Sequence, residues 1–203
     1  MTNSCWLPPR GTAIARLVMA LIVILPSVAA GQTAADTARP RHTRADIEFM
    51  QGMIAHHGQA ITMSGLAPAR TSWPPILLLA ERITVSQRDE IRLMRQWLLD
   101  RHEEAPSGET APSGHAGGSH GPLMPGMLTK PELAELEAAK GIQFERLFLE
   151  LMIRHHEGAL TMVAELFGTP GAGQQVDVFN FASEVDTDQR AEIVRMRALL
   201  KPR

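Results

Sequence analysis

The chain of 203 residues contains one short phrase twice, and this duplication constrains its fold more than any other feature. Met53-Ile54-Ala55-His56-His57 appears again ninety-nine residues later as Met152-Ile153-Arg154-His155-His156. A second match pairs residues 87–94 with residues 189–196. Self-similarity of this kind is typical of a repeated structural unit. We therefore expect two copies of one unit in a single chain.

Each copy has the residue pattern of two amphipathic helices. Apolar residues recur at spacings of three and four, which places them on one face of an α-helix. Capping-box patterns and Pro and Gly breakers predict helices at residues 43–66 and 75–101 in the first copy, and at 129–167 and 176–200 in the second, with a break near Gly141. We expect an all-α fold, in which two helical hairpins form a four-helix bundle.

The first thirty residues have the features of a secretory signal peptide. Arg10 and Arg16 precede a short apolar run at 17–25, and Pro26 and small residues follow it. The run is too short for a spanning helix, which needs ~20 apolar residues. Cleavage near residue 30 would leave a periplasmic or secreted chain with no stable membrane insertion. Its net charge would change from −2 to −4 because two arginines are lost, which argues against a nucleic-acid partner.

The mature chain is expected to have a flexible start at 31–42 and one domain at 43–203. Within that domain, repeat one covers 43–101 and repeat two covers 129–200. Gly, Pro and Ser dominate residues 105–127, which predicts a flexible linker. The linker also carries four candidate metal ligands, His115, His120, Met124 and Met127. A solvated spacer that happens to contain these residues is an equally good interpretation.

The histidine pairs lie on the faces that each copy must bury. Met53, His56 and His57 share one side of the first helix, and Met152, His155 and His156 share the equivalent side. A buried imidazole costs free energy unless its nitrogens find partners. A thioether one turn from an imidazole suits copper, and Cu(I) best. These six residues are the main candidates for a metal site, and the alternative is a core of satisfied histidines and space-filling methionines.

Further residues on the same faces could support such a site. Gln87 and Glu90, and their equivalents Gln189 and Glu192, could bond the second imidazole nitrogen and orient the ring. Additional ligand candidates, each of which could equally be core filler, are Met50, Met63, Met94, Met162 and Met196.

At these residues the chain resembles the ferritin-like family named domain of unknown function 305. The matching phrases are Asp46-x-x-Phe49-Met50-x-x-Met53-Ile54-x-His56-His57, Met124-Pro125-Gly126-Met127-Leu128-Thr129, Phe144-Glu145-x-x-Phe148-Leu149-x-x-Met152-Ile153-x-His155-His156 and Gln189-x-x-Glu192-Ile193. The resemblance implies an exported ferritin-like bundle linked to copper handling in the bacterial periplasm, with the same six residues as ligands. Leu149 stands where the first copy has Met50, which implies a weaker second site.

Three functions remain open from the sequence. The first is a periplasmic copper buffer, carrier or resistance protein, whose partners would be the metal ion and other periplasmic copper-handling proteins. The second is a ferritin-like metal-dependent oxidoreductase that uses iron or copper. Di-iron bundles typically use Glu-x-x-His, which the expected helices lack, so binding is favoured over catalysis. The third is a pH-responsive structural or interaction bundle without metal.

Overall fold

The computed structural model describes residues 42–108 and 123–201, and within these ranges its regular elements are all helices. They are α2 (Arg44–Gly65), α3 (Ala67–Arg70), α4 (Pro74–Leu99), α5 (Lys130–Ala138), α6 (Gly141–Gly168) and α7 (Val176–Leu199). The predicted all-α fold is confirmed. The expected signal peptide, residues 31–41, His115 and His120 lie outside the described residues. In the described part of the chain, no helix is both long and apolar enough to cross a membrane.

The helix boundaries follow from local sequence signals. Thr43 and Asp46 form a capping box at the start of α2, and Thr129 and Glu132 form another at the start of α5. Each box satisfies backbone N–H groups that have no partner within the helix. The predicted break is also present, since α5 ends at Ala138 and α6 begins at Gly141, whose φ is +55°. The one-turn helix α3 lies between the helices predicted at residues 43–66 and 75–101.

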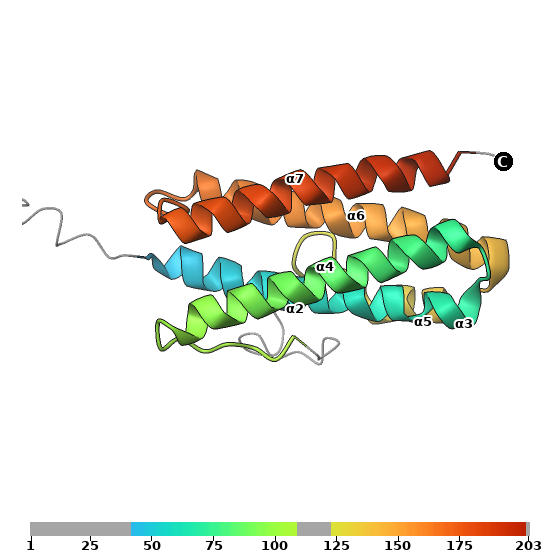
Figure 1. The fold of residues 1–203 in the computed structure, drawn as a ribbon, viewed down its shortest axis with the longest axis horizontal. Helices are drawn as coiled ribbons and strands as arrows, with labels where there is room; N and C mark the ends of the chain where they lie inside the picture. Colours follow the sequence, from blue (N-terminus) through green and yellow to red (C-terminus); the bar gives the residue numbers. More distant parts are fainter. Residues whose placement is uncertain (1–41, 109–122, 202–203) are drawn as a thin grey trace, which may run out of the picture. The chain divides into compact units, whose positions relative to one another are not determined.

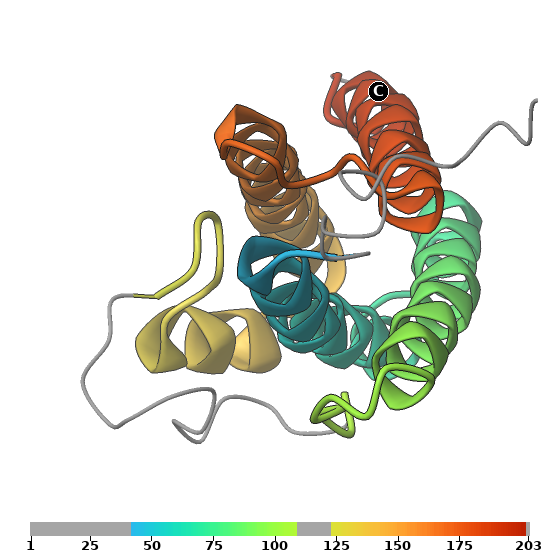
Figure 2. The same ribbon diagram turned by 90° about the vertical axis from the view of Figure 1, so that its left-hand side faces the viewer.

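The four long helices pack as two antiparallel hairpins. α2 packs along α4, α6 packs along α7, and α2 and α6 join the hairpins (Figures 1 and 2). Each hairpin corresponds to one copy of the sequence repeat. Among the described residues, α4 and α7 make only sparse backbone contact, although Figure 2 shows them as neighbours.

A layer of polar side chains divides the core into two hydrophobic clusters. The first cluster includes Met50, Met53, Met94, Met162 and Val185, and the second includes Met63, Ile83, Met152, Ile193 and Met196. On each of the four long helices, two polar residues lie in the sequence between residues of the first cluster and residues of the second cluster. We call these residues the polar layer: His56, His57, Gln87, Glu90, His155, His156, Gln189 and Glu192.

Candidate metal centre

All four histidines of the polar layer point into the protein. His56, His57 and His156 have no exposed surface, and His155 is 1% exposed. Met53 and Met152, one turn before the histidines, are also fully buried. The inward orientation expected from the helical periodicity is therefore present in both copies.

Two of the imidazoles are held by carboxylates on the partner helix of their own hairpin. His57 Nε2 lies 2.5 Å from Glu90 Oε2, and His156 Nε2 lies 2.7 Å from Glu192 Oε2. An ionised carboxylate only accepts hydrogen bonds, so the ring proton is on Nε2. In the neutral ring, Nδ1 then keeps its lone pair. This atom has no hydrogen-bond partner in either histidine.

The polar-layer glutamines do not hold the rings. Neither amide atom of Gln87 has a hydrogen-bond partner, and the same is true of Gln189 Oε1. Of the residues expected to orient the imidazoles, the structure gives this role to the two glutamates.

The other two imidazoles meet where the copies join. The ring centroids of His56 and His155 are 3.9 Å apart, with an angle of 37° between the ring planes. His56 Nε2 donates to the carbonyl oxygen of Pro125 at 2.9 Å, which leaves Nδ1 as an unpartnered lone pair. Neither ring nitrogen of His155 has a hydrogen-bond partner among the described residues.

Burial keeps these two rings uncharged. Burial, and next the neighbouring His57, lower the pKa of His56 from 6.5 to about 3. Burial, and next His56, also hold the pKa of His155 well below its ordinary value. Both rings are therefore neutral at pH 7, which is the state that ligates metals.

The carbonyl that bonds His56 comes from a segment predicted to be flexible. Residues 123–128 instead form an ordered turn, closed by a hydrogen bond from Met127 N to Met124 O. Residues 123–127 of the predicted linker therefore belong to a defined turn in the structure. Met127 is buried, and Met124 is half-buried beside Gly52, so these two linker candidates are part of the turn.

Two features hold this turn in place. The side chain of Gln59 donates to Leu128 O at 3.0 Å and accepts from Leu128 N at 2.7 Å. Gly126 has a φ of +75°, and a Cβ atom at Gly158 would collide with the Pro125 carbonyl. Sequence reasoning missed the roles of Gln59 and Pro125. The Pro-Gly pair was the available signal, since it favours a tight turn.

Thioether side chains are the further donors near the histidines. Within residues 42–108 and 123–201, no three His, Cys, Asp or Glu side chains are grouped as a metal site would require. Sulfur donors lie nearby, since Met53 and Met152 are one helical turn from the histidines. Met50, Met94 and Met162 share the cluster of Met53, while Met63 and Met196 share that of Met152.

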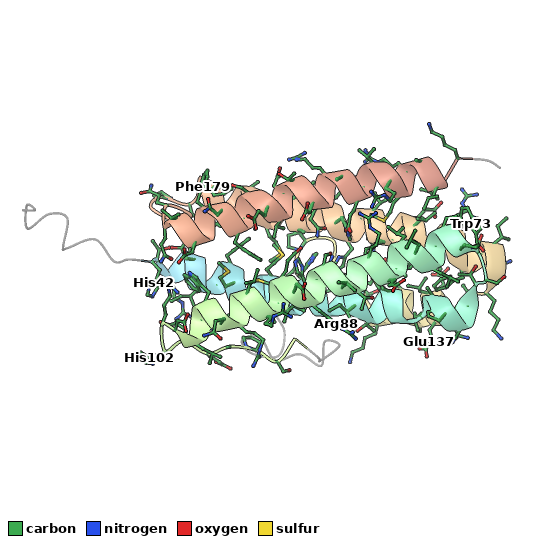
Figure 3. All side chains as sticks on the ribbon, in the orientation of Figure 1. His42, Trp73, Arg88, His102, Glu137 and Phe179 are labelled. Atoms are coloured by element: carbon green, nitrogen blue, oxygen red, sulfur yellow. The ribbon has the colours of Figure 1, made fainter. Side chains whose placement is uncertain are left out.

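Two further histidines lie apart from the polar layer. His42 and His102 are near the N-terminus of α2 and the C-terminus of α4, at one end of the helices (Figure 3). His42 packs edge-on against Trp97, with ring centroids 5.6 Å apart, and His102 is exposed. They provide natural controls for the buried histidines.

Comparison with known proteins connects this arrangement to a family. Residues 46–200 match the family DUF305, a domain of unknown function. The chain belongs to the DUF305 family. A solved DUF305 fragment from Deinococcus radiodurans is 31% identical, with a TM-score of 0.66 over 79% of this chain and 98% of that one. A candidate secreted DUF305 protein from Streptomyces coelicolor is 29% identical, with a TM-score of 0.63 over 77% and 91% of the two chains.

A third similar structure is that of a copper-bound protein. CopM in its Cu(II)-bound form is 26% identical to this DUF305 chain, with a TM-score of 0.60 over 76% of this chain and 95% of CopM. Among curated proteins, an uncharacterised protein of Acanthamoeba polyphaga mimivirus is 45% identical over 56 residues. That match spans 28% of this chain and only 37% of the viral protein.

Proposed function

We propose that this protein is a periplasmic copper-binding protein, a buffer or carrier, built on a ferritin-like four-helix bundle of two fused hairpins. The observation that carries the proposal is the set of buried imidazole nitrogens without partners. His56, His57 and His156 each leave Nδ1 unpartnered, and His155 leaves both nitrogens unpartnered. An unsatisfied buried polar group costs about 1–3 kcal/mol. A metal ion bound at these atoms would offset that cost.

The neighbouring donors support copper as the metal. Imidazole binds several transition metals, but thioether sulfur selects soft ions such as Cu(I). Met53 and Met152 supply thioethers one turn from the histidines, and both are buried away from water. The similarity to a protein solved with copper supports the same choice.

The carboxylates argue for binding rather than for iron chemistry. A di-iron site needs several glutamates that converge on the metals. Here Glu90 and Glu192 bond the Nε2 atoms of two histidines and thereby orient the rings. Such carboxylate–histidine pairs are a common support for metal-ligating imidazoles. The ligands we propose are Met53, His56, His57, Met152, His155 and His156.

The test is a Cu(I) titration of the mature protein against a competing chelator, preceded by elemental analysis of protein isolated from the periplasm. We expect stoichiometric binding by the wild type and by His102→Gln, whose changed side chain is exposed. A variant with all four polar-layer histidines changed to glutamine should not bind. Equal binding by that variant would refute the proposal. If the variant does not fold, 15N NMR of the wild type decides, because Cu(I) must shift the histidine Nδ1 resonances.

A further inference from the structure

A cavity of about 300 Å³ opens between α4 and α7, beside the first hydrophobic cluster. Its walls include Met50, Leu93, Met94 and Trp97 on one side and Asp177 and Glu184 on the other. The cavity occupies the seam where the two hairpins make only sparse backbone contact. At this place the helices do not fully enclose the first hydrophobic cluster.

Two thioethers lie at the bottom of this cavity. Met50 and Met94 line it, yet they are 1% and 0% exposed, so they sit at its floor rather than at its rim. They come from different helices of the first hairpin and belong to the same core cluster as Met53. A soft cation that reaches the floor would meet two thioether side chains from neighbouring helices.

These sulfurs connect to the polar layer along α2. Met50, Met53 and His56 follow one another at intervals of three residues, so they share a helix face. Each interval advances about 4.5 Å along the axis, since the rise is about 1.5 Å per residue. An ion could therefore pass from Met50 to Met53 to the imidazoles through short exchanges of ligand.

Acidic side chains continue from the cavity toward the same layer. A second hollow shares Asn180 and Glu184 with the first and extends along α7 to Asp188. Burial raises the pKa of Asp188, and the negative charges of Glu90 and Glu192 raise it further. At the rim, Asp177 is paired with Arg101 at 3.2 Å. Further along α7, Glu184 and Asp188 continue the acidic side chains toward Glu90 and Glu192, and this negative charge attracts cations.

The second copy lacks the outermost step of this route. The position equivalent to Met50 is Leu149, which is buried in the other core cluster. We propose that the cavity between α4 and α7 is the uptake site for Cu(I), where Met50 and Met94 capture the ion before Met53 passes it to the histidines. This inference rests on the proposed copper function and adds a direction to it: copper is loaded through the first copy.

The test compares the rate of copper uptake with the final occupancy. The double variant Met50→Leu/Met94→Leu keeps the side-chain volume and removes both sulfurs, and Leu is the residue already present at 149. Stopped-flow transfer of Cu(I) from a chelator should be slowed by about tenfold, which corresponds to a barrier higher by about 1.4 kcal/mol. Ile91→Leu is the control, since Ile91 belongs to the same cluster and carries no sulfur. Equal uptake rates in the double variant and the wild type would overturn the inference.

A second measurement uses only the wild type, so it does not depend on whether the double variant folds. Ag(I), a stable probe for Cu(I), is added below one equivalent to protein with labelled methionine methyl groups. The Met50 and Met94 resonances should broaden first. If Met124 or Met63 responds first instead, uptake does not occur through this cavity. If the wild type binds no Cu(I), the proposed function is refuted. If it binds Cu(I) normally, but the double variant is not slowed and Met50 and Met94 do not broaden first, only the uptake route is refuted.

Discussion

The substitution Gly158→Ala should test how the turn at 123–128 supports the histidine layer. Gly158 lies inside α6, where alanine would ordinarily be favourable. Its missing side chain leaves room for the backbone of Pro125 and Gly126, and an added Cβ would collide with both. Backbone atoms cannot rotate away as a flexible side chain can, so we expect the turn to move off α6.

The magnitude follows from the bonds that the turn makes. Displacement would break the hydrogen bond from His56 to Pro125 and both hydrogen bonds between Gln59 and Leu128. At about 1 kcal/mol for each bond, the loss is about 3 kcal/mol. The higher helix propensity of alanine offsets about 1 kcal/mol of this. The expected net loss in the free energy of unfolding is about 2 kcal/mol.

Urea unfolding of the metal-free protein, followed by circular dichroism, measures this difference. The matched control is Gly65→Ala, because Gly65 is also helical and an added Cβ would meet nothing within 4 Å. The free energy of unfolding of this control should equal or exceed that of the wild type. If Gly158→Ala unfolds within about 0.5 kcal/mol of the wild type, the turn is not held as we describe.

Two further predictions concern the polar layer. Glu90→Gln removes the charge from the acceptor at His57, so the Cu(I) affinity measured by chelator competition should fall about tenfold. Glu150→Gln, on an exposed face, should leave it unchanged. Stability should also depend on pH, because the pKa of His56 is about 3 in the folded protein, against the ordinary histidine value of 6.5 in the unfolded chain. The unfolded chain then binds more protons below pH 6.5, so the free energy of unfolding should fall by about 2 kcal/mol from pH 7 to pH 5. Equal urea midpoints at both pH values would contradict this assignment.

Local sequence signals were sufficient for most of the fold. Capping boxes, Pro and Gly breakers and apolar periodicity predict the four long helices and the break at Gly141, since each signal acts within a few residues. The ordered turn at 123–128 could not be predicted in this way. Its contacts with Gln59 and Gly158 join residues far apart in the sequence, whereas its local composition is typical of a linker.

The candidate site was predictable in part for the same reason. Helical periodicity alone places both histidine pairs on buried faces. It does not determine how α4 is rotated against α2, so Gln87 and Glu90 were both candidate partners for His57. The tertiary packing selects Glu90, and the equivalent choice in the second hairpin is Glu192. The close contact between the rings of His56 and His155 depends on the packing between hairpins, which no local pattern encodes.

The contact between His56 and His155 joins identical positions of the two copies. A polypeptide with a single hairpin could form this contact only by dimerising, and at low concentration most molecules would be separate. Covalent fusion makes the encounter intramolecular, so its probability no longer depends on how much protein the cell contains. Fusion also allows the copies to diverge. One such difference is Leu149, which stands in the second copy at the position equivalent to Met50. A symmetric dimer would carry every substitution twice, while this chain can change one half and leave the other intact.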